Sequence, residues 1–256
     1  MMLVQFDLYG RMAHFRKFYS NVTSLSYYFP PRNTVMGIIA AVLGMQRDSY
    51  YETLSEDKLG ISIQMLREPR KLLISTDYLD IQNVGVKSLR GMTGMKPKKI
   101  EYILAKDGDE IGYRIFVASR NSDTETLLTR LYSNLSASAP IYPISLGPAY
   151  CLARIDKKTV TLQKNVVTEH SDGSQPRKIK TIVPSDNVLR IDPKLMEGKR
   201  IMLEESLPPN FHEERKIIGG SRNYVFEARG NDMDIFVRSE IFGVEDGDRM
   251  TYGIFM

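Results

Sequence analysis

Apolar residues recur along the chain with two different periods, and each period predicts one kind of element. Residues 2–9 alternate between apolar and polar side chains, a pattern typical of a strand. A helix is predicted after residue 32, because apolar residues there recur at helical spacing: Val35, Ile38, Ile39, Val42 and Leu43. A second stripe of this kind predicts a helix over residues 123–136.

The ends of the first helix are also marked in the sequence. Pro30 and Pro31 enforce an extended approach, so the helix is expected to begin with Asn33 or Thr34 as its N-cap. Gly44 is expected to end it. A short polar helix is predicted over the tyrosine- and acid-rich residues 48–58.

Further strands complete the first half of the chain. One is predicted from residue 61 that continues through residue 77, and another over residues 142–155. The dipeptide Asp107-Gly108 predicts a hairpin between residues 100–105 and 112–119. The resulting order is strand, helix, strand, strand, helix, strand. It predicts an α+β fold, a ferredoxin-like (RRM-like) βαββαβ domain over residues 1–156, with an insertion at about 80–100.

The second half of the chain shows a different pattern. From residue 157 to residue 256 the sequence has short strand candidates separated by Asp, Gly, Asn and Pro, and no long helical stripe. We expect a smaller β-rich C-terminal subdomain packed on the first domain.

Composition narrows the class of protein without naming an activity. The chain has 256 residues, 42% of them hydrophobic and 26% charged, values that are ordinary for a globular protein. A single cysteine excludes an internal disulfide and a multi-cysteine zinc site, and it fits a cytoplasmic location. The longest apolar run, residues 35–45, is too short to cross a bilayer, so no membrane partner is expected.

The distribution of charge says more than the net charge of +4. Residues 11–19 alternate cations with aromatic rings, which suits stacking on unpaired bases while their phosphates are held. The next segment leads into the helix start, where free backbone N–H groups favour a phosphate. The candidate RNA-binding residues here are Phe15, Arg16, Lys17, Tyr27, Arg32, Asn33 and Thr34. The alternative is that Phe15 and Phe18 fill the core while the charges face water.

A second basic segment lies in the insertion. Lys87, Arg90, Lys96, Lys98 and Lys99 occur there among glycines with no acidic residue between them. Ordinary surface mixes its charges, so this composition favours a polyanion as ligand. A solvated loop without a ligand is the alternative.

Motifs for catalysis are missing from the sequence. It has no phosphate-binding glycine loop, no dinucleotide fingerprint, no His-Glu-x-x-His and no nucleophile elbow. Of three histidines only His14 lies among cations, where it could act as a general base on a ribose 2′-hydroxyl. We expect no catalytic residue, no metal and no cofactor.

Residues 15–19 and 26–37 together resemble a known block. Their sequences, FRKFY and SYYFPPRNTVMG, resemble the N-terminal FRK…Y-x-F-P-P-R-T-T-x-x-G block of the Cas-five family. That family is the RAMP-superfamily subunit of type I CRISPR effector complexes (Cascade). Supporting matches occur at residues 98–102, 142–147 and 207–208, and again at 224–226.

The resemblance implies a fold and a function. It implies a ferredoxin-like domain with a long β-hairpin thumb that grips the 5′ handle of CRISPR RNA. It also implies contacts with the large subunit and the backbone subunit of the complex, and leaves contact with target DNA near the protospacer-adjacent motif open. Gly147 and Arg215 join the RNA-binding candidates through their place in the matching segments.

One branch of the family, in type I-C systems, processes precursor CRISPR RNA with a tyrosine and a Lys-His pair. This chain contains no Lys-His dipeptide, and Lys98-Lys99 follow the insertion instead. We therefore expect a non-catalytic subunit similar to those of type I-B systems. A metal-independent endoribonuclease is the alternative, and a general RNA-binding domain outside CRISPR is a third reading.

Overall fold

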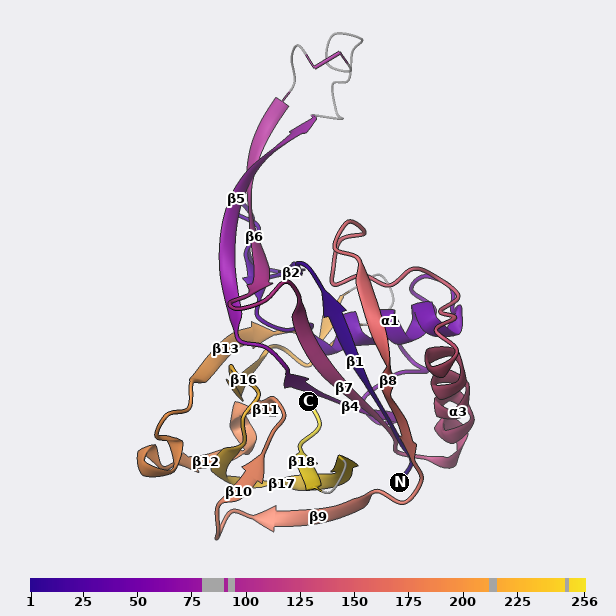
Figure 1. Ribbon diagram of the computed structural model, residues 1–256, viewed down its shortest axis with the longest axis vertical. Helices are drawn as coiled ribbons and strands as arrows, with labels where there is room; N and C mark the ends of the chain where they lie inside the picture. Colours follow the sequence, from indigo (N-terminus) through magenta and orange to yellow (C-terminus); the bar gives the residue numbers. More distant parts are fainter. Residues whose placement is uncertain (80–89, 92–94, 212–215, 247–248) are drawn as a thin grey trace.

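The computed structural model describes residues 1–79, 90–91, 95–211, 216–246 and 249–256. Within these ranges the chain is a mostly-β α+β protein with two α-helices and several separate sheets (Figure 1). No helix in this part of the chain is long and apolar enough to cross a membrane.

The first half of the chain builds a four-stranded sheet and both helices. Its strands are β1 (Leu3–Gly10), β4 (Leu59–Met65), β7 (Ile111–Ser119) and β8 (Ala153–Gln163), in the order β4-β7-β1-β8. All neighbouring pairs are antiparallel. The helices α1 (Arg32–Leu43) and α3 (Ser122–Ser136) pack against each other, and α3 also packs on the sheet. The predicted strand over 2–9 and both predicted amphipathic helices are confirmed.

The helix ends follow local chemistry. The predicted N-cap of α1 at Asn33 or Thr34 is wrong. The helix begins at Arg32, directly after Pro31, which offers it no side-chain hydrogen bond. Gly44 ends α1 with a positive φ of 72°, as predicted. Helix α3 is capped by Asn121, whose side chain accepts a hydrogen bond from the backbone N–H of Thr124.

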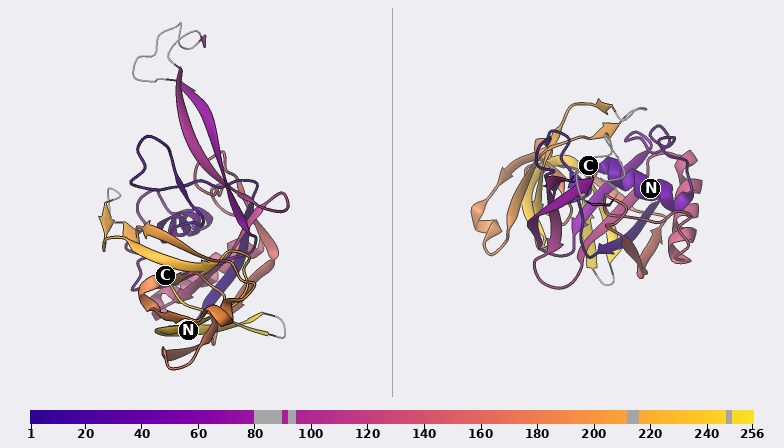
Figure 2. Two further views of the ribbon diagram at one scale, coloured as in Figure 1. Left: turned by 90° about the vertical axis from the view of Figure 1, so that its left-hand side faces the viewer. Right: turned by 90° about the horizontal axis from the view of Figure 1, so that it is seen from above.

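A long antiparallel hairpin stands away from the body of the protein (Figures 1 and 2). It consists of β5 (Pro69–Leu79) and β6 (Met95–Ala105). The prediction that residues 71–77 extend the second strand is wrong, because they form a separate strand of this hairpin. The predicted pairing of residues 100–105 with 112–119 is also wrong. Strand β7 already pairs with β1 on one edge and β4 on the other, so β6 pairs with β5.

Two further local predictions are wrong. Residues 48–58 form turns and not a helix, and they bury Tyr51 and Leu54 in the core. The last strand of the sheet begins at Ala153, because the segment before it is bent and Gly147 adopts a φ of 105°. Position 156, the predicted domain boundary, therefore lies inside β8, and the division into two domains stays a prediction.

The second half of the chain contains two more sheets. The larger centres on β17 (Met233–Asp246), which pairs with β9 (Val167–Asp172), β10 (Arg177–Ile179), β12 (Val188–Ile191) and β18 (Arg249–Gly253). The smaller has the order β11 (Val183–Pro184), β16 (Arg222–Glu227), β13 (Ile201–Leu207). Short strands β14 (Asn210–Phe211) and β15 (Ile217–Ile218) pair with each other, and two 3-10 turns, η2 (Ser185–Asn187) and η3 (Pro193–Met196), complete this half.

The two halves share one hydrophobic core. Phe29, which precedes α1, packs its ring 5.3 Å from that of Phe226 on β16 and 6.0 Å from that of Tyr224. All three rings are buried. The segment that leads into α1 is therefore fixed by residues from the far end of the chain.

Candidate nucleic-acid interface

A groove with a volume of about 1050 Å³ lies where five segments meet. They are the segment after β1, the start of α1, the outer half of the β5–β6 hairpin, the loop that precedes β8, and residues 208–211. Eight of the predicted RNA-binding residues line it: Phe15, Arg16, Tyr27, Asn33, Thr34, Lys96, Lys98 and Gly147. The helix start and the lysine-rich hairpin, which are about 60 residues apart in the sequence, thus border the same groove.

The structure corrects the predicted RNA-binding role of Arg32. Its side chain is only 1% exposed, and its guanidinium donates hydrogen bonds to the backbone carbonyl oxygens of Leu54 and Leu59. Burial lowers the pKa of Arg32 to about 10, so it remains charged near neutral pH. Enclosed in this way, the guanidinium stabilises the turns at 48–58 and does not reach a phosphate.

The structure also corrects the prediction that Phe15 and Tyr27 stack on bases. They are 3% and 1% exposed, and the Tyr27 hydroxyl donates to the backbone carbonyl of Ser206 at 2.6 Å. These rings form the floor of the groove. The alternative reading, that Phe15 fills the core, is the one that the structure supports.

Exposed rings stand at the groove in their place. Phe18, Tyr78 and Tyr150 line it and are 47%, 42% and 52% exposed. Tyr78 and Tyr150 were missed by the sequence reasoning. Tyr78 directly precedes the basic insertion and Tyr150 follows the Gly147-Pro148 turn, so their position beside predicted binding segments was the available signal.

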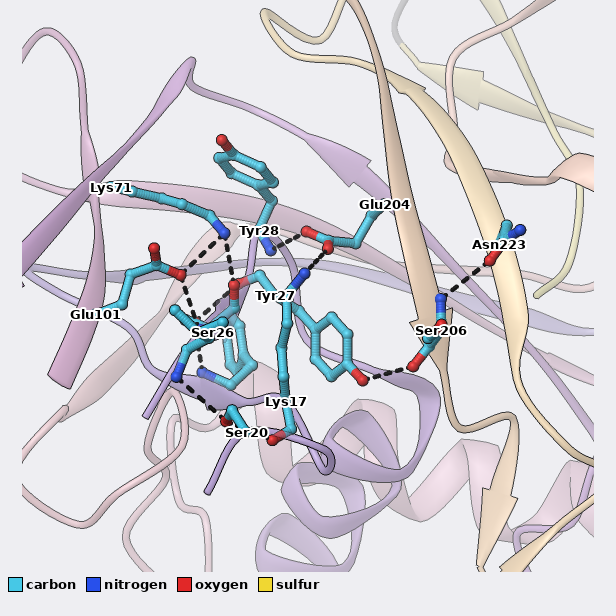
Figure 3. Close-up of polar contacts among 12 residues, drawn as sticks. Lys17, Ser20, Ser26, Tyr27, Tyr28, Lys71, Glu101, Glu204, Ser206 and Asn223 are labelled. Atoms are coloured by element: carbon cyan, nitrogen blue, oxygen red, sulfur yellow. Dashed lines mark hydrogen bonds and ion pairs between the residues drawn. The ribbon is translucent and has the colours of Figure 1, made fainter. Parts of the chain in front are cut away.

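Lys17 does not line the groove either. It forms an ion pair with Glu204 of β13, and their side chains are 12% and 3% exposed (Figure 3). Burial lowers the pKa of Lys17, but the hydrogen bond and negative charge of Glu204 outweigh this and raise it overall. Lys17 is therefore committed to a contact between the loop and the C-terminal half.

Two carboxylates hold the short strand β3 (Ser26–Tyr27) and the residue after it (Figure 3). Glu101 of β6 accepts a hydrogen bond from the backbone N–H of Ser26 at 2.9 Å and forms an ion pair with Lys71 of β5. Glu204 accepts one from the backbone N–H of Tyr28 at 3.0 Å. Strand β3 in turn pairs with β2 (Phe15–Arg16), so this wall of the groove is fixed from both sides.

The lysines of β6 lie on two faces of the strand. Lys96 and Lys98 line the groove, whereas Lys99 is exposed and does not. Successive side chains of a strand point to opposite faces, which places Lys99 on the other side of β6. Arg90 is exposed beyond the described strands, and Lys87 and Arg215 lie outside the described residues.

Gly147 owes its place to close backbone packing. A Cβ at this position would lie 2.0 Å from the backbone carbonyl oxygen of His14, and its φ of 105° is unfavourable for other residues. The loop before β8 can therefore approach His14 and close one end of the groove. The backbone N–H of His14 donates to Leu146 at 3.0 Å in the same contact.

His14 itself lines the groove with a fixed ring. Its Nδ1 lies 2.8 Å from the backbone carbonyl oxygen of Glu101. Burial lowers its pKa, and the nearby charges of Arg16 and Lys98 lower it further, against the opposing effects of Glu101. In the described ranges, no three His, Cys, Asp or Glu side chains gather to hold a metal ion.

The comparison with protein families is decisive at this point. Residues 3–157 match the model of a family described as CRISPR-associated protein (Cas_Cas5). The chain belongs to this family. The matched residues contain both helices, the hairpin, β1, β4, β7 and the first part of β8, and most of the groove. The family resemblance read from the sequence is thus confirmed, and no curated protein matches the chain significantly.

Solved structures with the same fold align with this chain over nearly its whole length. A CRISPR protein from Archaeoglobus fulgidus is 16% identical with a TM-score of 0.58, and the match covers 99% of this chain and 100% of that one. A chain of a CRISPR RNA-guided surveillance complex is 14% identical with a TM-score of 0.51, and the match covers 90% of each. At these identities the likeness concerns the fold.

Replacing Arg32 tests its structural role. Arg32→Ala leaves the carbonyl groups of Leu54 and Leu59 without their donors in the core, so we expect a loss of roughly 3–5 kcal/mol in unfolding free energy. Arg47→Ala is the matched control, because that side chain is 78% exposed. Urea unfolding measures both variants, and an equal stability of the two would contradict the assignment.

The buried ring of His14 predicts a pH effect on stability. The pKa of the His14 imidazole is lower in the folded chain than its value of 6.5 in the unfolded chain. The neutral ring therefore stabilises the folded state above pH 6.5, and this contribution to the free energy of unfolding is lost as the pH falls below 6.5. His14→Asn keeps an amide donor for Glu101 and removes the titration. Its unfolding free energy should fall less between pH 7.5 and 5.5 than that of the wild type. Parallel curves in urea titrations would contradict this.

Proposed function

We propose that this chain is a non-catalytic subunit of a type I CRISPR effector complex that holds the 5′ handle of CRISPR RNA in the groove. One observation carries the proposal. Cations, exposed rings and a helix start from distant parts of the sequence line a single open groove in a member of this family.

The lining residues suit single-stranded RNA. Arg16, Lys96 and Lys98 supply positive charge for phosphates, and the exposed rings of Phe18, Tyr78 and Tyr150 offer faces for unpaired bases. The start of α1, with Asn33 and Thr34 at the groove, adds the partial positive charge of a helix N-terminus. This combination suits a flexible single strand with exposed bases better than it suits a duplex, because the bases of a duplex are stacked inside the helix.

We further infer that the first sheet and its helices form a ferredoxin-like, RRM-like unit with the β5–β6 hairpin as a thumb inserted in it. The strand order β4-β7-β1-β8 and the sequence of strands and helices along the chain support this. The β-rich second half would then be a smaller subdomain that braces the groove.

The partners follow from the same proposal. The chain would contact the backbone subunit and the large subunit in the cytoplasm, in a complex of the type I-B kind, with target DNA near the protospacer-adjacent motif as a further contact left open. Support comes from family membership and from the fold shared with a chain of a CRISPR RNA-guided surveillance complex.

Removing the two groove lysines tests RNA binding. Lys96→Ala/Lys98→Ala should weaken binding of CRISPR repeat RNA roughly tenfold or more at moderate salt, because two phosphate contacts are lost. The slope of log affinity against log salt should flatten by about 0.7 for each lost contact to a single strand. Filter binding over a salt series measures both quantities.

Lys99→Ala is the matched control, since Lys99 lies on the same strand but does not line the groove. We expect this variant to bind nearly as the wild type does. If both variants bind alike, the outer half of the hairpin does not hold the RNA and the proposal loses its main support.

A second candidate function is metal-independent cleavage of precursor CRISPR RNA. His14 favours it, because its lowered pKa keeps the ring neutral and able to accept a proton, with Arg16 and Lys98 among the charges that act on it. The non-catalytic reading is preferred because the chain has no Lys-His pair of the type I-C kind.

Incubation with precursor repeat RNA in a chelator separates the two functions. For a non-catalytic subunit we expect intact RNA after hours, in gels that resolve single nucleotides. A discrete cut that disappears when the ribose at that site is 2′-deoxy, and that His14→Asn abolishes, would instead establish the endoribonuclease.

A further inference from the structure

His14 occupies an unusual place among the residues of the groove. The cations there, Arg16, Lys96 and Lys98, can donate hydrogen bonds but cannot accept them. The imidazole is 7% exposed and packs on the ring of Tyr102 with centroids 5.9 Å apart. Gly147 packs on its backbone carbonyl, so both the ring and the backbone of His14 are held in place.

The hydrogen bond of the ring fixes which nitrogen carries the proton. The carbonyl oxygen of Glu101 can only accept, so Nδ1 at 2.8 Å must be the donor. Because burial and the neighbouring cations disfavour a second proton, the ring is neutral near pH 7 and Nε2 keeps its lone pair. No described residue forms a hydrogen bond with Nε2.

A neutral Nε2 selects a different partner than a lysine does. Phosphate oxygens have only lone pairs and cannot donate to it, whereas a ribose 2′-hydroxyl or a base amino group can. We propose that His14 Nε2 accepts a hydrogen bond from a 2′-hydroxyl or base amino group of the bound strand, and so makes the groove selective for such a donor at one nucleotide position. This inference rests on the proposed RNA-binding function and adds a specificity-determining residue to it.

Charged and titratable groups face the ring from each element packed on it. Arg16 lies on β2, and Glu101, Lys98 and Tyr102 lie on β6. Acidification that protonates His14 converts Nε2 into a donor. The selectivity should therefore weaken at low pH.

Two variants test the two ring nitrogens of His14 separately. The side-chain amide of His14→Asn can replace Nδ1 as donor to Glu101 but offers nothing at the position of Nε2. The longer His14→Gln can place an amide oxygen, an acceptor, near that position while losing the Glu101 contact. Because they remove opposite contacts, a general folding defect would not produce opposite binding results.

The binding probes are two sets of handle RNA from the CRISPR repeat of the genome that encodes this chain. In one set each ribose in turn is 2′-deoxy. In the other a single base lacks its amino group: inosine for guanosine, nebularine for adenosine, or zebularine for cytidine. The set that contains the sensitive position distinguishes a ribose contact from a base contact.

For the wild-type chain we expect one substitution to weaken binding roughly tenfold, because the buried acceptor is left unpaired. The same substitution should change the affinity of His14→Asn less than twofold, and His14→Gln should keep the sensitivity. Identical profiles for the wild type and His14→Asn over both sets overturn the inference and leave RNA binding intact. Failure of the wild type to bind the unmodified handle RNA overturns the proposed function together with it.

Discussion

Two carboxylates hold the segment from Ser26 to Tyr28 between the hairpin and the C-terminal half, and the groove depends on this arrangement. Glu101 and Glu204 each accept one backbone N–H of the segment, and each forms an ion pair with a lysine from a different part of the chain. Removing one partner of the largely buried Lys17–Glu204 pair is costly, because the other charge is left without compensation in a poorly solvated place. The segment therefore has little freedom to move away.

The cations predicted to bind RNA fall into two groups. Lys17 and Arg32 are buried and hold loops and turns together, whereas Arg16, Lys96 and Lys98 line the groove. The buried cations determine where the groove is, and the groove cations determine its charge. A substitution in either group would reduce RNA binding, but only one in the buried group should also reduce stability.

The sequence predicted elements well wherever the decisive interactions were local. Periodicity located both helices, and Gly44 ended the first one, because helix spacing and a left-handed cap depend on neighbouring residues. Pairing of distant strands was not readable in this way. The chain does bend at Asp107-Gly108, yet this segment joins strands of two different sheets, since β7 has both edges occupied by β1 and β4.

The site was predictable as a set of segments but not residue by residue. Alternating cations and rings marked the loop after β1 correctly as part of the groove. Burial separated Phe15 from Phe18 and Arg32 from Arg16. It depends on contacts with distant residues, such as Tyr113 for Phe15 and Leu54 for Arg32, that no local pattern reveals. The groove therefore contains the predicted segments with partly different side chains.

Hydrogen exchange of the full chain with and without CRISPR repeat RNA tests the central claim most directly. The account predicts that RNA slows exchange in residues 15–27, 95–100 and 146–151, the segments that build the groove, while β9 and β18 stay unchanged. Protection confined to β9 and β18, with no change at the groove, would contradict it.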